Sequence, residues 1–139
     1  MKESYERRGA LRYRVLNPAF VVTSHARAET GRLIDISSNG LAFKYLADKG
    51  SSVGLSELDI FLADHPFYLG RLPVKTVGDN NMSDVISFSA KTWRRRGVKF
   101  GVLTDRQRSR LEYFVQHHTT WKKWQGQPSF RRNRDETDR

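Results

Sequence analysis

Short alternating apolar runs, broken by turn residues, are the feature that most restricts how this chain can fold. They extend from about Pro18 to Val102. Strand-like runs cover residues 19–28, 31–37, 41–45, 56–63 and 67–77, and a last pair covers 85–93 and 98–103 around the basic segment 94–97. Strands at such short and even spacing are typical of a sandwich or a small barrel. The sequence therefore predicts a mainly β domain.

The second of these runs has a pattern that assigns its faces. Simple alternation places Ile34 and Ile36 on one face of the strand, and Leu33, Asp35 and Ser37 on the other. An Asn-Gly pair follows, and both of its residues tolerate positive φ. A turn is expected there, with two polar side chains just before it.

The end of the chain has a helical pattern instead. Thr104 and Gln107 fit a capping box. Apolar or aromatic side chains then recur at helical spacing, at Leu111, Phe114, Val115, His118 and Trp121. We expect one amphipathic helix over roughly 105–124, packed on the β domain. The arginine-rich residues 1–16 predict a flexible leader. The folded domain is expected over 17–124, and a disordered basic tail over 125–139.

Composition limits the environment and the partner. The net charge of +10 favours an anionic partner such as a nucleotide, a nucleic acid, an acidic protein or a lipid head group. The chain has no cysteine, which excludes disulfides and thiolate metal sites and suits a reducing compartment. It begins without the apolar segment of a signal peptide and contains no run long enough to span a membrane. These features predict a cytoplasmic protein without membrane insertion.

The leader carries an R-x-x-x-R motif at Arg8 and Arg12. A spacing of four puts both side chains on one side of a helix or of an extended strand. Two guanidinium groups on one side can bind phosphates, or the O6/N7 edge of guanine, through paired hydrogen bonds. Arg7 and Arg14 flank the motif and are candidates for additional ligand contacts. Taken alone, arginines four apart are common in basic chains.

A second motif, D-x-S-x-x-G, is formed by Asp35, Ser37 and Gly40. A carboxylate at Asp35 can accept hydrogen bonds from N1 and N2 of a guanine, and the Ser37 hydroxyl can add a contact to phosphate, ribose or base. Gly40 permits a tight bend and a close approach of the backbone to a ligand. Taken alone, the same residues also suit an ordinary β-turn.

Together, in this order, the two motifs resemble the signature of the PilZ domain, a small bacterial β-barrel that binds cyclic di-GMP. The similarity covers about residues 5–122. It implies an antiparallel barrel of six to seven strands with a C-terminal helix, and a ligand site made by Arg8, Arg12, Asp35, Ser37 and Gly40. It also implies a non-catalytic receptor whose leader becomes ordered over the ligand and so changes a surface for a flagellar, pilus, polysaccharide or regulatory partner. Some PilZ proteins add an aromatic or basic residue where Trp93 stands.

Other functions find less support. Trp93 lies on a polar strand face, where it can stack on a base or pack at the barrel rim. The histidines lack the spacing of a zinc site, and no phosphate loop, nucleophile elbow or close acid pair is present, so no metal, cofactor or catalytic residue is expected. The surplus of arginine, including residues 94–96 and 131–134, leaves a general nucleic-acid-binding barrel as the alternative. A second alternative is a PilZ-like adaptor that binds no ligand and acts only through protein contacts.

Overall fold

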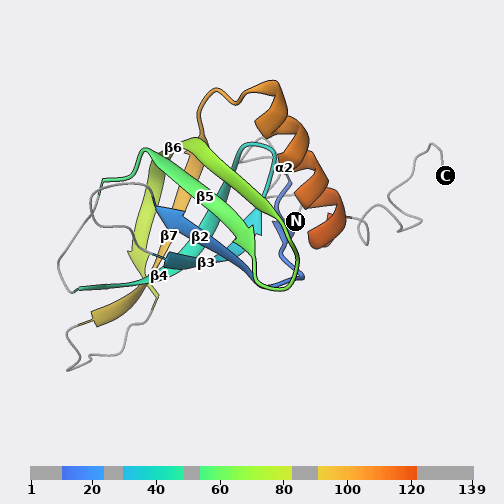
Figure 1. Cartoon of the computed structure of the whole chain (residues 1–139). Helices are drawn as coiled ribbons and strands as arrows, with labels where there is room; N and C mark the ends of the chain where they lie inside the picture. The colour runs from blue at the N-terminus through green and yellow to red at the C-terminus, as the bar shows by residue number, and fades with distance from the viewer. Residues whose placement is uncertain (1–10, 24–29, 49–53, 83–90, 122–139) are drawn as a thin grey trace.

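The computed structural model describes residues 11–23, 30–48, 54–82 and 91–121. They form seven strands and one long helix in the order β1 (Tyr13–Arg14), β2 (Ala19–Thr23), β3 (Thr30–Ile36), β4 (Gly40–Asp48), β5 (Glu57–Leu62), β6 (Tyr68–Asn81), β7 (Lys91–Phe100) and α2 (Asp105–His118). Figure 1 shows the strands wrapped into a barrel with α2 lying across one end.

The sheet closes on itself. Its strands follow the order β1-β3-β2-β5-β6-β7-β4, every pair is antiparallel, and an additional pairing of β3 with β4 joins the two sides. Six strands therefore form a closed antiparallel barrel, and β1 is an extra strand that pairs with β3. Closure gives partners to the backbone N–H and C=O groups that would be unpaired at the edges of an open sheet. The predicted mainly β barrel of six to seven strands with a C-terminal helix is confirmed.

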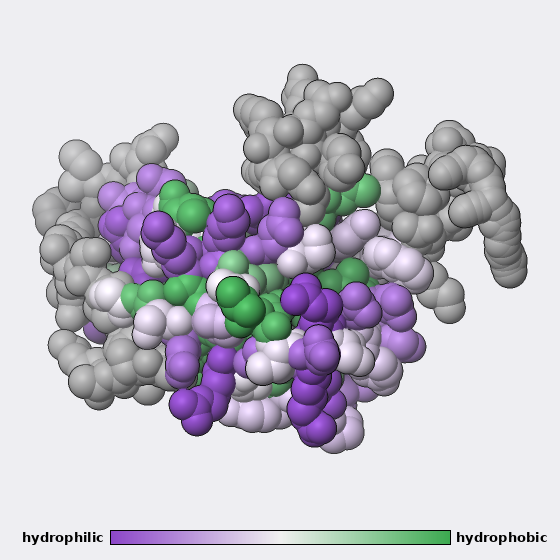
Figure 2. Space-filling view, turned by 90° about the horizontal axis from the view of Figure 1, so that it is seen from above, coloured by the Kyte–Doolittle hydropathy of each residue, from purple (hydrophilic) through white to green (hydrophobic). Residues whose placement is uncertain are grey.

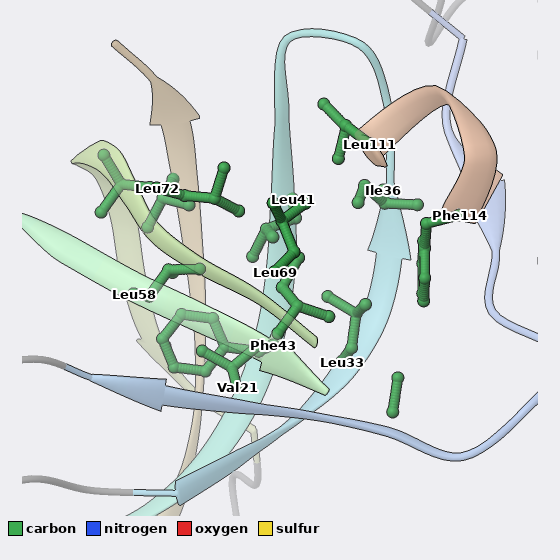
Figure 3. Packing of buried hydrophobic residues seen from close by; sticks show 14 of the residues in the cluster. Val21, Leu33, Ile36, Leu41, Phe43, Leu58, Leu69, Leu72, Leu111 and Phe114 are labelled. Carbon is green, nitrogen blue, oxygen red and sulfur yellow. The ribbon is translucent and has the colours of Figure 1, made fainter. Parts of the chain in front are cut away.

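Alternating apolar side chains fill the barrel. Figure 3 shows Val21, Phe43 and Leu58 pointing into the space that the strands enclose. Leu111 and Phe114 extend this core from the helix, and both lie close to Ile36 at the end of the barrel. The helix therefore covers one open end of the barrel with the face predicted from its spacing.

The helix begins as predicted and ends earlier. The Thr104 side chain accepts a hydrogen bond from the Gln107 backbone, and the Gln107 side chain accepts one from the Thr104 backbone, so the capping box is present. The expected end near residue 124 is wrong, because the helix ends at His118. Thr119 is extended and forms a β-bridge with Val15.

Two further expectations are corrected. A β-bulge between Leu33 and Asp35 interrupts the alternation of β3, so Leu33 and Ile36 are both buried, whereas Ile34 is only partly buried. A bulge inserts one residue and shifts all later side chains to the opposite face. The expected division into two strands around the basic segment 94–97 is also wrong, because β7 runs without interruption through this segment and pairs with β4 and β6. The expected strand residues 24–28 and 85–90 lie outside the described residues.

The segment just before the barrel is joined to the end of the helix. The Leu16 amide donates to the His118 carbonyl (2.8 Å), and the Thr120 amide donates to the Arg14 carbonyl (2.9 Å). Residues 13–14 also pair with β3. The last residues of the expected leader therefore connect β3, which carries the second motif, with the C-terminal end of α2.

Candidate functional site

Asp35 forms the centre of the candidate site, on the outer surface of β3. Arg12 Nη1 donates to its Oδ1 at 2.7 Å, and Arg95 Nη2 donates to its Oδ2 at 3.2 Å. The Asp35 side chain is only 17% exposed. The structure thus brings Arg12 and Asp35 from the two motifs together, and adds an arginine from β7 that the motifs do not contain.

Ser37 forms the turn between β3 and β4. Its hydroxyl oxygen accepts hydrogen bonds from the backbone amides of Asn39 (3.1 Å) and Gly40 (3.2 Å), and its hydroxyl group donates to the Gly40 carbonyl (3.3 Å). The side chain is buried, at 3% exposure. Ser37 therefore fixes the shape of the turn beside Asp35.

Gly40 is required where β4 packs against β7. A Cβ at this position would lie 2.0 Å from the Val98 carbonyl oxygen, far below contact distance. The close approach expected at Gly40 is thus one between two strands of the barrel. In the described part of the chain, the glycine has a structural reason that does not need a ligand.

A shallow pocket of about 200 Å³ opens beside these residues, with Arg12, Ser37, Gly40 and Lys99 among those that line it. Binding sites for small molecules usually have volumes of about 300–1,000 Å³. The floor next to the pocket is made of small residues, since Ala42 of β4 pairs with Asp35 on one side and with Gly97 on the other. The described residues therefore provide two cations, Arg12 and Lys99, on the pocket lining, and small side chains on the strands next to it.

One hydrogen-bond donor of Arg12 has no partner among the described residues. Its Nε is buried and has no acceptor among the described residues, although Nη1 is bound to Asp35. Buried polar atoms nearly always have a partner, so such an atom calls for an explanation. An anion in the adjoining pocket would supply the missing acceptor.

The other candidate residues lie along the same outer surface where they are described. Arg14 pairs with Asp35 in the β1–β3 ladder, so the two side chains share a face, and Arg14 is exposed. Trp93 is 50% exposed, and the Lys44 ammonium lies over its ring, 5.5 Å from the centroid. A base that stacked on this face of the ring would have to displace Lys44. Arg7 and Arg8 lie outside the described residues.

Two arginines of the basic segment 94–96 have a structural partner. Arg94 and Arg96 both bind the Asp79 carboxylate (2.8 Å each), and the Tyr45 hydroxyl donates to the same group (2.7 Å). Burial alone raises the pKa of Asp79, but these hydrogen bonds outweigh that effect and the pKa lies below its usual value. This network joins β4, β6 and β7, and it leaves Arg95 as the arginine of the three that reaches the candidate site.

A larger cavity, of about 600 Å³, lies between the segment before β1 and the helix. Leu11, Tyr13, Leu111 and Trp121 are among the residues that line it, whereas Arg12 lines the smaller pocket and not this one. From above, the molecule shows a short hydrophobic band between strongly hydrophilic residues (Figure 2). The larger volume carries fewer of the charged groups that recognise an anion, so we assign the candidate site to the smaller pocket.

The part of the chain that the structure describes has neither a cluster of metal ligands nor a helix suited to a membrane. The described residues contain no group of three or more histidine, aspartate or glutamate side chains placed to hold a metal ion. In the same parts of the chain, no helix has the length and apolarity needed to cross a bilayer.

The motifs did not point to the cations on β4 and β7. Lys44 pairs with Arg95, and Lys99 pairs with Gly40, all on the surface that carries Asp35. The signal was present in the sequence, because Trp93, Arg95, Gly97 and Lys99 alternate along one strand. The expected break between two strands at residues 94–97 divides this alternation and hides it.

The barrel has the fold of the PilZ domain. The PilZ domain of YcgR from Escherichia coli with c-di-GMP superposes with a TM-score of 0.60 at 14% identity, covering 78% of this chain and 88% of that one. A second YcgR structure from Escherichia coli, in complex with c-di-GMP, gives a TM-score of 0.58 at 15% identity, covering 78% of this chain and 44% of that one. MrkH, described as a c-di-GMP-dependent transcription regulatory factor, gives 0.55 at 13% identity over 76% and 48%.

The chain thus spans less than half of the longer YcgR and MrkH chains. No family model matches the sequence, and no curated protein matches it. The structural likeness establishes the fold, while the ligand has to be argued from the site.

Proposed function

We propose that this protein is a non-catalytic receptor of the bacterial cytoplasm that binds cyclic di-GMP at the surface around Arg12, Asp35 and the Ser37–Gly40 turn. The observation that carries the proposal is that Arg12 and Asp35, from separate motifs, meet in one ion pair, and that Arg12 also lines a pocket with Ser37 and Lys99. The ligand supplies what this surface lacks, namely two phosphates and two guanines.

Charge and hydrogen bonding favour this ligand class. Asp35 brings one negative charge, whereas Arg12, Arg14, Arg95 and Lys99 bring four positive charges to the same face. Such a surplus favours a small anion over a neutral ligand. A carboxylate next to the anion site can select guanine, because guanine offers two adjacent donors and adenine does not.

The proposed signal follows from how the leader is attached. Arg8 and Arg12 would bind phosphates or guanine edges, and this would order residues before Leu11 over the shallow pocket. Residues 13–16 connect this segment with β3 and with the end of α2. Ligand binding would therefore change the surface near the helix that a downstream protein contacts, a transition from disorder to order.

Titration calorimetry with cyclic di-GMP tests the proposal. Arg8→Ala and Arg12→Ala should each lower the affinity by at least ~2 kcal/mol, the range of a lost charge-assisted contact. Arg106→Ala is a matched control, because Arg106 is exposed on α2 away from Asp35. Wild-type affinity in both leader variants would exclude the proposed site.

Discrimination between guanine and adenine tests the role of Asp35. Asp35→Asn leaves one acceptor oxygen in place of two and should reduce the preference for cyclic di-GMP over cyclic di-AMP. An unchanged preference would remove Asp35 from guanine recognition, even if the overall affinity fell.

General nucleic-acid binding remains the alternative function, but two of the arginines that suggested it are bound within the protein. Arg94 and Arg96 are bound to Asp79, and the Arg96 side chain is only 4% exposed. A gel shift with mixed-sequence nucleic acid that appears only at low salt and persists in Asp35→Asn would support this alternative.

A further inference from the structure

Arg95 is the basic residue of the site that neither motif contains. It lies on β7, yet its Nη2 reaches Asp35 Oδ2 at 3.2 Å across β4. The β4 residue between Asp35 and β7 is Ala42, whose methyl group leaves the path open. The contact is therefore possible because the floor of the site is made of small side chains.

Two arginines on one carboxylate leave an excess of positive charge. Arg12 occupies Oδ1 and Arg95 occupies Oδ2, so Asp35 balances one of the two guanidinium groups. Lys44 lies opposite Arg95 in the β4–β7 ladder and adds another cation. The cluster therefore keeps a net positive charge after Asp35 is counted, and this charge favours a phosphate beside it.

Arg95 is also better placed to move than Arg12. Its side chain is 41% exposed, against 18% for Arg12, and its bond to Asp35 is longer. Each Asp35 oxygen already accepts one bond from an arginine, so a guanine edge has to share the carboxylate with both arginines or take the place of one of them. The longer and more exposed contact is the one expected to open.

We infer that Arg95 is a third arginine of the ligand site, which binds Asp35 in the empty protein and transfers to a phosphate of the bound cyclic dinucleotide. This inference rests on the proposed function and adds a residue to it. The exchange leaves Asp35 free to receive the guanine edge while the guanidinium group gains a phosphate acceptor.

Calorimetry on Arg95→Gln, Arg95→Lys and the control Arg106→Gln tests the inference with cyclic di-GMP. Arg95→Gln should bind at least about tenfold more weakly, Arg95→Lys should fall in between because it keeps the charge but loses the planar fork, and Arg106→Gln should match the wild type. Thermal unfolding should be similar in all four proteins, because Arg106 is exposed and Asp35 keeps its bond to Arg12 when Arg95 is replaced.

The outcomes separate the two proposals. Wild-type affinity in Arg95→Gln would overturn the inference alone, and tighter binding would overturn it too, because Arg95 would then only compete for Asp35. A wild-type protein that fails to bind would overturn the proposed function, and the inference with it.

The ³¹P resonances of bound cyclic di-GMP give a readout that a purely structural role would not move. They should differ between complexes with the wild type and with Arg95→Lys, because the hydrogen bonds to phosphate change. Identical resonances would mean that Arg95 contacts only Asp35 and would overturn the inference.

Discussion

Replacing Gly40 by alanine should destabilise the barrel strongly, whether or not ligand is present. The added Cβ would lie 2.0 Å from the Val98 carbonyl oxygen and 3.1 Å from the Lys99 Cα, both backbone atoms of β7. Backbone cannot rotate away as a side chain can, so β4 and β7 must separate. Their separation would strain the neighbouring bond from the Phe100 amide to the Asn39 carbonyl (2.7 Å).

The cost can be worked out from these contacts. Overpacking a close-packed site typically costs about 1–3 kcal/mol. Losing one backbone hydrogen bond adds about 0.5–1.5 kcal/mol. The sum is about 1.5–4.5 kcal/mol, which lowers the urea midpoint by roughly 0.8–2.3 M if the m value is about 2 kcal/mol per M.

Gly97→Ala is the matched control, because it lies on the adjoining strand of the same surface. A Cβ there would have Val77 Cγ2 as its nearest neighbour at 3.7 Å, which is an ordinary contact. Urea unfolding followed by circular dichroism should therefore show a large drop in midpoint for Gly40→Ala and little change for Gly97→Ala. Equal midpoints would refute the claim that the strand packing requires this glycine.

Three further changes test the framework of the site. Asp79→Asn should cost about 3 kcal/mol of unfolding free energy in urea, because it leaves the buried Arg96 charge unpaired, and wild-type stability would contradict that pairing. Ser37→Ala should cost about 1–3 kcal/mol, because it removes the acceptor for two turn amides; unchanged stability with weak ligand binding would instead assign the hydroxyl to the ligand. Burial and the nearby His65 and His117 lower the pKa of His118, so the folded state favours the neutral ring and stability should fall as the pH drops below about 6.5. Urea midpoints at two pH values should show a smaller fall for His118→Gln, and an equal fall would contradict this source of pH dependence.

The sequence predicted the parts of the fold that follow from local pattern. The turn at Asn39 and the capping box at Thr104 depend on neighbouring residues, and both are present, as are strands within the alternating runs where these are described. The bulge in β3 depends on how two strands twist against each other in the closed barrel, and the residues around it do not predict it. For this reason the faces of Ile34 and Leu33 were assigned wrongly.

Part of the candidate site was also predictable from the sequence. Asp35 and Arg12 were candidates because their chemistry suits a guanine nucleotide, and the structure places them in contact. Arg95 could not be found from spacing, since it lies 60 residues from Asp35 and meets it only when β7 is placed next to β4. Likewise, the sequence could not show that Gly40 packs against Val98, because that contact also depends on closure of the barrel.

Amide NMR during a titration with cyclic di-GMP tests the central claim most directly. The account predicts saturable shifts concentrated at residues 5–14, 35–40 and 95–99, with smaller ones at the end of α2. The amides of β5, which pairs with β2 and β6 and with none of the strands that carry Asp35, Gly40 or Arg95, should remain unchanged and serve as an internal reference. Absence of saturable shifts at 35–40, or shifts confined to the helix, would contradict the claim that the barrel surface around Asp35 binds this nucleotide.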